Sequence, residues 1–423
     1  MTSRDFSLTS LIPGVFLPTI VFEIGIGAVL PVIALTGRNL GGSIAVAGLL
    51  VSMLAIGQIL GDVPAGALAA RIGDRRAMVL AASVTIVTLG ASALARSVWV
   101  LGAGVLATGA ANAVFMLARQ SYLTEASPVL RRARALSTLA GVQRIGTFIG
   151  PFAGALVIHL AGVGAVYWLA VGTSAVAAVI VAVVPDVADT AETAAAKLRA
   201  ATVVPMRRIV ADHRQVFLTL GFAVLAVGAV RGARQTILPL WTEHLGMSAT
   251  TTSLVFGLSG AVDMLLFYPS GKVMDRMGRL WVAIPSMLVM AVAMIALPFS
   301  HTVAAVSIVA MILGFGNGIG SGILMTLGAD VAPADRRAQF LGVWRVIQDT
   351  GNAGGPLLVA AGAALGSLGA GILATGTTAL LAAGALARWV PQWSVHANRG
   401  TRRRAAEQAA AASADVAVEP GAR

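Results

Sequence analysis

The sequence predicts an all-α polytopic membrane protein with twelve transmembrane helices, arranged as two six-helix halves related by an internal repeat. Of its 423 residues, 57% are hydrophobic and 11% are charged, whereas charged residues make up about 25% of a typical soluble domain. Apolar runs of about 20 residues, the length that crosses a bilayer, follow one another along nearly the whole chain. A glycine- and arginine-rich motif then occurs twice, 205 residues apart.

The twelve spans lie between polar or charged turns. We place them at residues 12–35, 44–68, 77–96, 98–123, 137–160, 164–184, 215–239, 250–270, 280–299, 303–325, 339–365 and 367–388. The first run belongs to the repeat and lacks a small-residue cleavage site, so we expect a span rather than a signal peptide. The chain divides into an N-terminal half (1–184), a cytoplasmic linker (185–214), a C-terminal half (215–390) and a disordered cytoplasmic tail (391–423).

The basic side chains are distributed unevenly between the two sides of the membrane. The even-numbered loops and the termini hold 23 of the 30 Lys and Arg residues, whereas the odd-numbered loops hold only Arg38 and Arg96. By the positive-inside rule this places both termini in the cytoplasm, and we expect a bacterial inner membrane location. The net charge of +12 then reflects topology, and we expect no nucleic-acid partner.

The two halves align at an offset of 205 residues without a gap from about residue 40 to 151. The matched positions are mostly glycines, prolines and polar residues that punctuate the helices: Leu40-Gly41 with Leu245-Gly246, Pro64 with Pro269, Gln143 with Gln348, and Gly150-Pro151 with Gly355-Pro356. Because repetition fixes architecture before any local pattern is interpreted, six spans were duplicated to give twelve.

The repeated motif follows the second and the eighth span. Its N-terminal copy contains Gly66, Arg71, Gly73, Arg75 and Arg76, and its C-terminal copy contains Gly271, Asp275, Arg276 and Gly278. Together with the duplication and the orientation, it resembles the Gly-x-x-x-Asp-Arg-x-Gly-x-Arg-Arg signature of the major facilitator superfamily, over residues 10–390. Ala70 stands where that signature has its acid, so the N-terminal copy departs from the pattern.

The motif is suited to a tight turn between helices, because glycine permits close backbone approach. Its arginine can pair with a carboxylate at a neighbouring helix end, and Glu125 and Asp330, also 205 residues apart, end the fourth and tenth spans. We expect a gating scaffold rather than a substrate contact. The intact network is expected in the C-terminal copy, as Asp275 and Arg276 with Asp330. In the N-terminal copy, Asp62 is expected to take over part of the electrostatic role of the missing acid by reaching span eleven.

The fifth span carries a second motif, made of Gly146, Gly150, Pro151 and Gly154. It resembles the Gly-x-x-x-Gly-Pro-x-x-Gly-Gly signature of antiporters in the same superfamily, with Ala155 in place of the last glycine. The resemblance favours export over uptake. Ordinary close packing of helices explains the glycines about equally well.

Nine ionisable residues lie inside the spans, where each costs at least ~2.5–3.5 kcal/mol at the helix centre and needs a partner or a function. They are Glu23, Asp62, Arg119, Arg144, Arg231, Arg234, Asp263, Arg345 and Asp349. Five arginines against four acids favour pairing.

Depth along the helices, counted at ~1.5 Å per residue, suggests two of the pairs. Arg144 lies about as deep as Asp263, and Asp62 about as deep as Arg345. In the resembled fold, span five packs on span eight and span two on span eleven, so both pairs are expected to bridge the halves on the cytoplasmic side and to separate when that side opens. Permanent structural pairs are the alternative. Asp349 is expected to pair with Arg345 along its own helix.

Glu23 stands alone near the middle of span one. The resemblance implies that spans one, four, seven and ten line the cavity, where a buried acid that alternates between neutral and ionised forms suits a proton carrier. The alternative is a structural glutamate bonded permanently to a neighbour such as Arg234. Arg231 and Arg234 share one face of span seven and are expected to bind an anionic group or to tune Glu23; the alternative is that their side chains extend outward to the membrane surface. The other cavity residues are Arg119, which the resemblance links to proton movement, and Asn317.

We therefore expect a secondary active transporter that works by alternating access, and proton-coupled efflux of small apolar or amphipathic compounds of the multidrug type. A proton symporter or a sugar or metabolite exporter of the same fold is the alternative, and a non-transporting sensor or scaffold is a remote one. We expect no enzyme, no cofactor and no metal, because the histidines are scattered and cysteine is absent. The expected partners are a small-molecule substrate, protons and the lipid bilayer, around a monomer.

Overall fold

The computed structural model describes residues 11–127, 129–184, 206–333 and 337–401, together with 403, 404 and 407. Every secondary-structure element in these ranges is a helix, as predicted. In the first half they are η2 (Ile12–Phe16), α1 (Leu17–Asn39), α2 (Ile44–Ile72), α3 (Asp74–Ala93), α4 (Val98–Ala126), α5 (Val129–Ala161) and α6 (Ala165–Val183). In the second they are α8 (Met206–Asp212), α9 (Arg214–His244), α10 (Ala249–Met277), α11 (Leu280–Ala296), η3 (Leu297–Phe299), α12 (Val303–Ile319), α13 (Ile323–Val331), α14 (Arg337–Leu365) and α15 (Leu368–Trp393).

Eleven of the described helical segments are long and apolar enough to cross a membrane, with α12 and α13 together forming one of them. The twelfth is α14, whose Arg345, Gln348, Asp349 and Asn352 make it more polar, but whose 29 residues also suffice for a span. The chain is thus a multi-pass membrane protein. The tenth span, expected to be a single helix, divides at Gly322, which adopts the left-handed region at φ +77°.

The helix ends follow from local chemistry. Five helices begin at a Ser or Thr whose side chain accepts a backbone N–H of the first turn, namely Ser43, Ser97, Ser248, Thr302 and Ser367. On the opposite side, the repeated motif turns at Gly73 and Gly278, with φ of 86° and 108°. Glycine adopts this left-handed backbone without a steric penalty. We call the two ends of the molecule the motif end and the far end.

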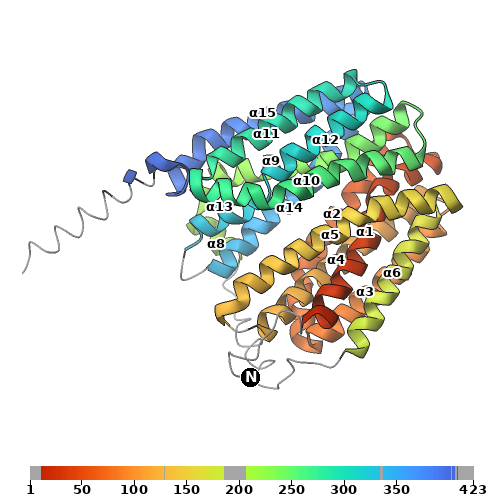
Figure 1. Cartoon of the computed structure of the whole chain (residues 1–423), viewed down its shortest axis with the longest axis horizontal. Helices are drawn as coiled ribbons and strands as arrows, with labels where there is room; N and C mark the ends of the chain where they lie inside the picture. The colour runs from red at the N-terminus through yellow and green to blue at the C-terminus, as the bar shows by residue number, and fades with distance from the viewer. Residues whose placement is uncertain are drawn as a thin grey trace, which may run out of the picture.

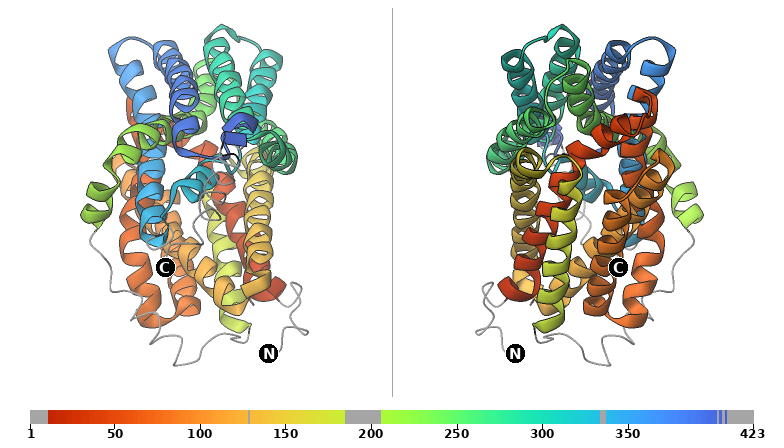
Figure 2. Two further views of the ribbon diagram at one scale, coloured as in Figure 1. Left: turned by 90° about the vertical axis from the view of Figure 1, so that its left-hand side faces the viewer. Right: turned by 90° about the vertical axis from the view of Figure 1, so that its right-hand side faces the viewer.

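The helices form two bundles, red to yellow and green to blue in Figures 1 and 2. In the first, α1 packs on α5 and α6, and α4 packs on α2 and α3. In the second, α9 packs on α14 and α15, and α12 packs on α10 and α11. Between the bundles, α2 packs on α14, α5 on α10, and α1 on α9. The expected pairing of span two with eleven and of span five with eight is confirmed.

Contacts between the bundles are closest toward the far end. A Cβ on Gly48 of α2 would lie 2.9 Å from Ala360 of α14, and a Cβ on Gly257 of α10 would lie 2.9 Å from the ring of Phe152 of α5. Both are closer than Cβ contacts in real proteins, so glycine permits this approach. In Figure 1 the bundles meet at the right and splay toward the end where α8 lies.

The structure describes parts of the two segments that were expected to lie outside the spans, the linker and the tail. Residues 185–205 of the expected linker lie outside the described residues, whereas α8 and the start of α9 occupy the rest. Of the expected disordered tail, the described part is ordered. Here α15 continues to Trp393, and the backbone N–H groups of Arg279 and Leu280 donate to the carbonyls of His396 and Ala397. This pairing holds the segment after α15 against the α10–α11 turn.

Candidate functional site

Glu23 is not alone. Arg119 of α4 donates from Nη1 to Glu23 Oε1 at 3.2 Å, and Thr147 of α5 donates to Oε2 at 3.4 Å. Arg119 also donates to Gln143 Oε1 at 2.6 Å, and the Glu23 and Arg119 side chains are only 4% and 3% exposed. We call Glu23, Arg119, Gln143 and Thr147 the Glu23 cluster. The expectation of an isolated glutamate is wrong, and its partner is Arg119 rather than Arg234, which lies against Asp263. A structural glutamate bonded permanently to a neighbour therefore stays the alternative, with Arg119 as that neighbour, because a buried charge requires a partner.

The antiporter-type motif of α5 lies directly beside this cluster. A Cβ on Gly146 would lie 2.6 Å from Glu23 Cβ, and one on Gly150 would lie 2.5 Å from the backbone nitrogen of Ala28. Gly154 also faces Ala28, and Pro151 is buried between them in the same helix. The motif glycines therefore bring α5 against the backbone of α1 and position Thr147 and Gln143 at Glu23.

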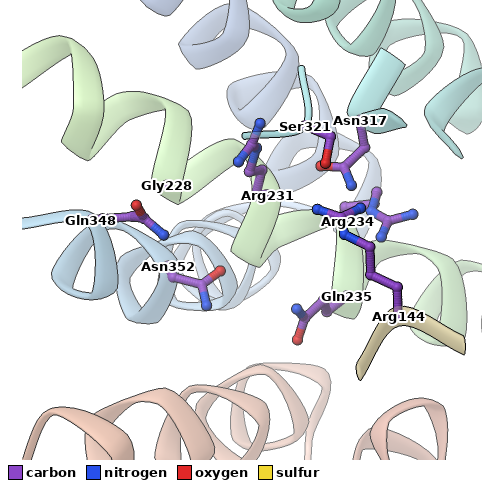
Figure 3. A pocket seen from close by; sticks show the side chains of 9 residues that line it. All are labelled: Arg144, Gly228, Arg231, Arg234, Gln235, Asn317, Ser321, Gln348 and Asn352. Carbon is purple, nitrogen blue, oxygen red and sulfur yellow. The ribbon is translucent and has the colours of Figure 1, made fainter. Parts of the chain in front are cut away.

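A second polar site is a pocket of about 190 Å³ between α5, α9, α12 and α14 (Figure 3). Every lining residue except Gly228 has a polar side chain: Arg144, Arg231, Arg234, Gln235, Asn317, Ser321, Gln348 and Asn352. Figure 3 shows Arg231 and Arg234 on α9, with Arg144 reaching in from α5. The expected cavity residues Arg231, Arg234 and Asn317 therefore share one pocket, whereas Glu23 and Arg119 form a separate site.

Asp263 of α10 organises the charges at this pocket. Its Oδ2 accepts a 2.6 Å hydrogen bond from Asn317 Nδ2 and lies 3.5 Å from Arg234 Nη2. Its Oδ1 lies 3.8 Å from Arg144 Nη1, while Arg234 Nη1 also donates to Ser259 Oγ at 3.0 Å. One carboxylate thus serves two guanidinium groups.

Both pairs expected between the halves are present as contacts. Besides Arg144 with Asp263, Arg345 Nε lies 3.9 Å from Asp62 Oδ2 and 3.5 Å from Asp349 Oδ2. Their depths differ from the expectation, because α10 extends to Met277 and leaves Asp263 fourteen residues from either end (263 − 249 and 277 − 263). The Arg144–Asp263 pair is therefore at mid-helix beside the pocket, and only the Asp62–Arg345 pair lies toward the motif end. Their gating role stays a prediction.

The far end carries an ion pair that we did not predict from the sequence. Arg38 Nε at the end of α1 lies 3.3 Å from both carboxylate oxygens of Glu243 at the end of α9. The two residues are 205 apart, so they occupy equivalent positions of the repeat and meet across the axis that relates the halves. That spacing was the signal that could have found the pair.

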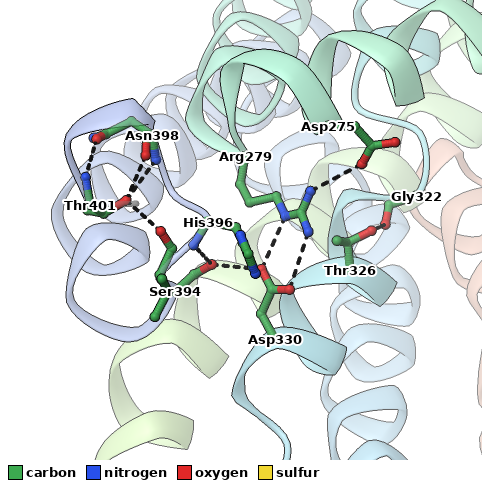
Figure 4. A network of polar contacts seen from close by, with 10 residues as sticks. Asp275, Arg279, Gly322, Thr326, Asp330, Ser394, His396, Asn398 and Thr401 are labelled. Atoms are coloured by element: carbon green, nitrogen blue, oxygen red, sulfur yellow. Dashed lines mark hydrogen bonds and ion pairs between the residues drawn. The ribbon is translucent and has the colours of Figure 1, made fainter. Parts of the chain in front are cut away.

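The motif network in the C-terminal copy differs from the expected one in its arginine, which is Arg279 rather than Arg276. Asp330 accepts from Arg279 Nε at 3.1 Å and from Nη2 at 3.3 Å, and Asp275 lies 3.5 Å from Arg279 Nη1 (Figure 4). Arg276 is exposed, so its expected role belongs to Arg279, which follows the left-handed Gly278 and turns toward α13. Ser394, beyond α15, also donates to Asp330 at 2.7 Å.

In the N-terminal copy, Arg75 donates to the carbonyls of Val181 and Ala182 at the end of α6, at 2.8 and 2.6 Å. Arg71 and Arg76 are exposed. The side chain of Glu125 lies outside the described residues. The two copies therefore fasten different helices: Arg75 holds the end of α6 through its backbone carbonyls, whereas Arg279 holds α13 through the carboxylate of Asp330.

Other polar residues of the two sites were missing from the sequence prediction. These are Gln143 and Thr147 in the Glu23 cluster, and Gln235, Ser321, Gln348 and Asn352 in the pocket. Two pairs among them are repeat equivalents, Gln143 with Gln348 and Thr147 with Asn352. Polar side chains at matching positions of two apolar helices were the available signal.

The chain is similar to known proteins, both to a family profile and to single relatives. The profile of the Major Facilitator Superfamily matches residues 15–356 and 220–412. The multidrug resistance protein MdtG of Proteus mirabilis is 28% identical over 157 residues, which are 36% of this chain and 39% of that protein. MdtG of Serratia proteamaculans is 29% identical over 161 residues, 37% of this chain and 39% of that protein. The match thus spans about two fifths of the length of these relatives.

Solved structures resemble the whole bundle. A point mutant of the nucleoside transporter NupG has a TM-score of 0.75 at 13% identity, covering 90% of this chain and 100% of that one. The xylose transporter XylE from E. coli, in an inward-open conformation, has a TM-score of 0.68 at 16% identity, covering 91% and 97%. At these identities the likeness shows the fold alone.

Proposed function

We propose that this chain, which belongs to the major facilitator superfamily, exports small compounds across the bacterial inner membrane by proton-coupled alternating access. The observation that carries this proposal is the pocket at the interface of the two halves, to which α5 of one half and α9, α12 and α14 of the other contribute. The direction of transport is supported by the motif in α5 and by the partial likeness to multidrug resistance proteins.

The Glu23 cluster supplies the proton site in this proposal. A carboxylate and a guanidinium buried together stabilise each other's charge, and protonation of Glu23 leaves Arg119 without its counter-charge. Arg119 then depends on Gln143, so a proton on Glu23 changes how α1, α4 and α5 are joined. Because α5 also carries Arg144 to the pocket, proton binding and substrate binding act on the same helix.

Alternating access requires that contacts at the two ends of the bundle form in turn. In this conformation the far end is held by Arg38 and Glu243 at 3.3 Å, while Asp62 and Arg345 toward the motif end are 3.9 Å apart. The basic loops assign the motif end to the cytoplasm. The outward-facing form would open the Arg38–Glu243 pair and shorten the Asp62–Arg345 pair.

The test is transport in inverted membrane vesicles that contain the full chain. An imposed proton gradient should drive accumulation of a fluorescent dye, and Glu23→Gln should abolish it, because the amide cannot carry the proton. Glu407→Gln, on an exposed side chain that pairs with Arg403, is the matched control and should keep full activity. Gradient-driven accumulation by the Glu23→Gln protein would remove Glu23 from the coupling.

One observation favours the alternative of a sugar or metabolite exporter over a multidrug one. With the exception of Gly228, the pocket is lined by polar side chains, whereas sites for apolar drugs are mainly apolar and aromatic. Competition for dye efflux by polar metabolites, but not by apolar cations, would favour this alternative.

A further inference from the structure

The pocket carries an excess of positive charge among the residues that the structure describes. Three guanidinium groups, from Arg144, Arg231 and Arg234, line it, and Asp263 is the acid that pairs with two of them. Charges away from water are costly unless they are paired. The pocket therefore favours a further negative charge.

Arg231 is the one of these three arginines that makes no ion pair with Asp263 in the described structure. Its Nη2 donates to the carbonyl of Gly320 at 2.6 Å, a neutral acceptor at the break between α12 and α13. Its Nε is buried without a hydrogen-bond partner, and so is Ser321 Oγ, which lines the same pocket. An unsatisfied buried donor costs about 1–3 kcal/mol, and more on a charged group.

We infer that the pocket binds an oxyanion, the carboxylate, phosphonate or sulfonate group of the exported compound, between Arg231 and Arg234. A guanidinium presents its N–H groups in a planar fork that matches such oxyanions in two-point contacts. Gln348 and Asn352 of α14 add neutral amide donors on another wall. The cavity of about 190 Å³ also has room for far more than a single water molecule. The inference rests on the proposed function and names its substrate class.

Arg144 gives the bound anion a mechanical consequence. It is the pocket residue that comes from the first half, and its partner Asp263 lies in the second at 3.8 Å. An anion in the pocket attracts Arg144 and Arg234 away from Asp263, so it replaces a direct bridge between the halves by one through the substrate. Loading the pocket then changes the interface that must rearrange during transport.

The test measures binding without any gradient, on the full-length chain purified in detergent. The probes share a ring and differ in charge: benzoate and phenylphosphonate are anions, benzamide is neutral and benzylamine is a cation. We expect the two anions to bind in isothermal calorimetry and to raise the melting temperature, with binding that weakens as salt is added. Benzamide and benzylamine should do neither.

Two substitutions move the affinity in opposite directions. Arg231→Gln should weaken anion binding by about tenfold or more, the value of a charge-assisted hydrogen bond. Asp263→Asn should strengthen it several-fold, because it removes the competing carboxylate, and a protein that merely misfolded would not gain affinity. Arg96→Gln, at an exposed turn, is the control and should bind as the unaltered chain.

Each outcome separates the two proposals. Equal binding of benzamide and benzoate, or weaker anion binding by the Asp263→Asn protein, overturns the oxyanion site even if proton-driven dye transport persists. Anion binding as expected, in a protein whose vesicles show no gradient-driven transport, supports the site and overturns the coupling instead.

Discussion

The two halves of the repeat carry different chemistry at two pairs of equivalent positions. Glu23 of α1 corresponds to Gly228 of α9, and Arg119 of α4 corresponds to Leu324 of α13. In the first half these positions hold a buried ion pair. In the second, Gly228 lines an open polar pocket and Leu324 is buried as an ordinary apolar residue.

The backbone packing around the two positions has not changed. A Cβ on Gly27 of α1 would lie 2.7 Å from the carbonyl of Thr147, and a Cβ on Gly232 of α9 would overlap the carbonyl of Asn352. Both members of each contact are separated by 205 residues from their counterparts. Duplication therefore preserved the way α1 meets α5 and α9 meets α14, while the side chains came to differ: a closed charge pair in one half and an open cationic pocket in the other.

The largest effect is expected when the first half is made to resemble the second. Arg119→Leu leaves Glu23 buried without a charge partner, which should lower the free energy of unfolding by about 3–5 kcal/mol. Thermal denaturation of the purified protein in detergent measures it. The double variant Glu23→Gln/Arg119→Leu removes both charges and should be clearly more stable than Arg119→Leu alone. An unchanged melting temperature in the single variant would show that the pair is not what holds this core.

A smaller effect is expected at the far end, where equivalent residues of the two halves meet. Arg38→Glu should repel Glu243 and open this end, and the exchange Arg38→Glu/Glu243→Arg should close it again. Because the chain contains no cysteine, spin labels can be placed on Arg96→Cys and His301→Cys without background. The distance distribution should shift to longer values in the single variant and return in the exchanged one. Failure of the exchange to restore it would exclude a direct ionic latch.

A still smaller effect is expected where the motif departs from its repeat. Asp62→Asn removes the link to Arg345 of α14 and should reduce the transport rate about two- to tenfold, since an ion pair with partly exposed members contributes about 1 kcal/mol. Ala70→Asp restores the acid of the signature and should leave the rate unchanged. Dye efflux from vesicles measures both variants at equal expression. An Ala70→Asp protein impaired more than Asp62→Asn would show that the motif tolerates no acid here.

Several features of the site follow from the amino-acid sequence alone. Charges inside a membrane are expensive, so partners can be sought at equal depth. Together with the neighbouring spans that the family resemblance implies, this criterion pairs Arg144 with Asp263 and Asp62 with Arg345, both present as contacts. Depth did not identify the partner of Glu23. The first span begins at Ile12 as expected, so Glu23 lies eleven residues in (23 − 12), whereas Arg119 lies only seven residues before the end of α4 at Ala126 (126 − 119).

The sequence by itself determined the membrane spans and their grouping into two related bundles. Length and hydropathy dictate a helical span, since a helix satisfies its backbone hydrogen bonds within one apolar segment of the bilayer, and the 205-residue repeat dictates the duplication. The tertiary structure alone decided which side chains meet around each helix. Spacing along a chain gives depth but not direction, so it could not distinguish Arg119 from Arg234 as the partner of Glu23. The packing of α4 beside α1 made that choice, because it brings Arg119 Nη1 to 3.2 Å from Glu23 Oε1. Arg231 of α9, by contrast, faces the pocket and makes no ion pair with a carboxylate among the described residues.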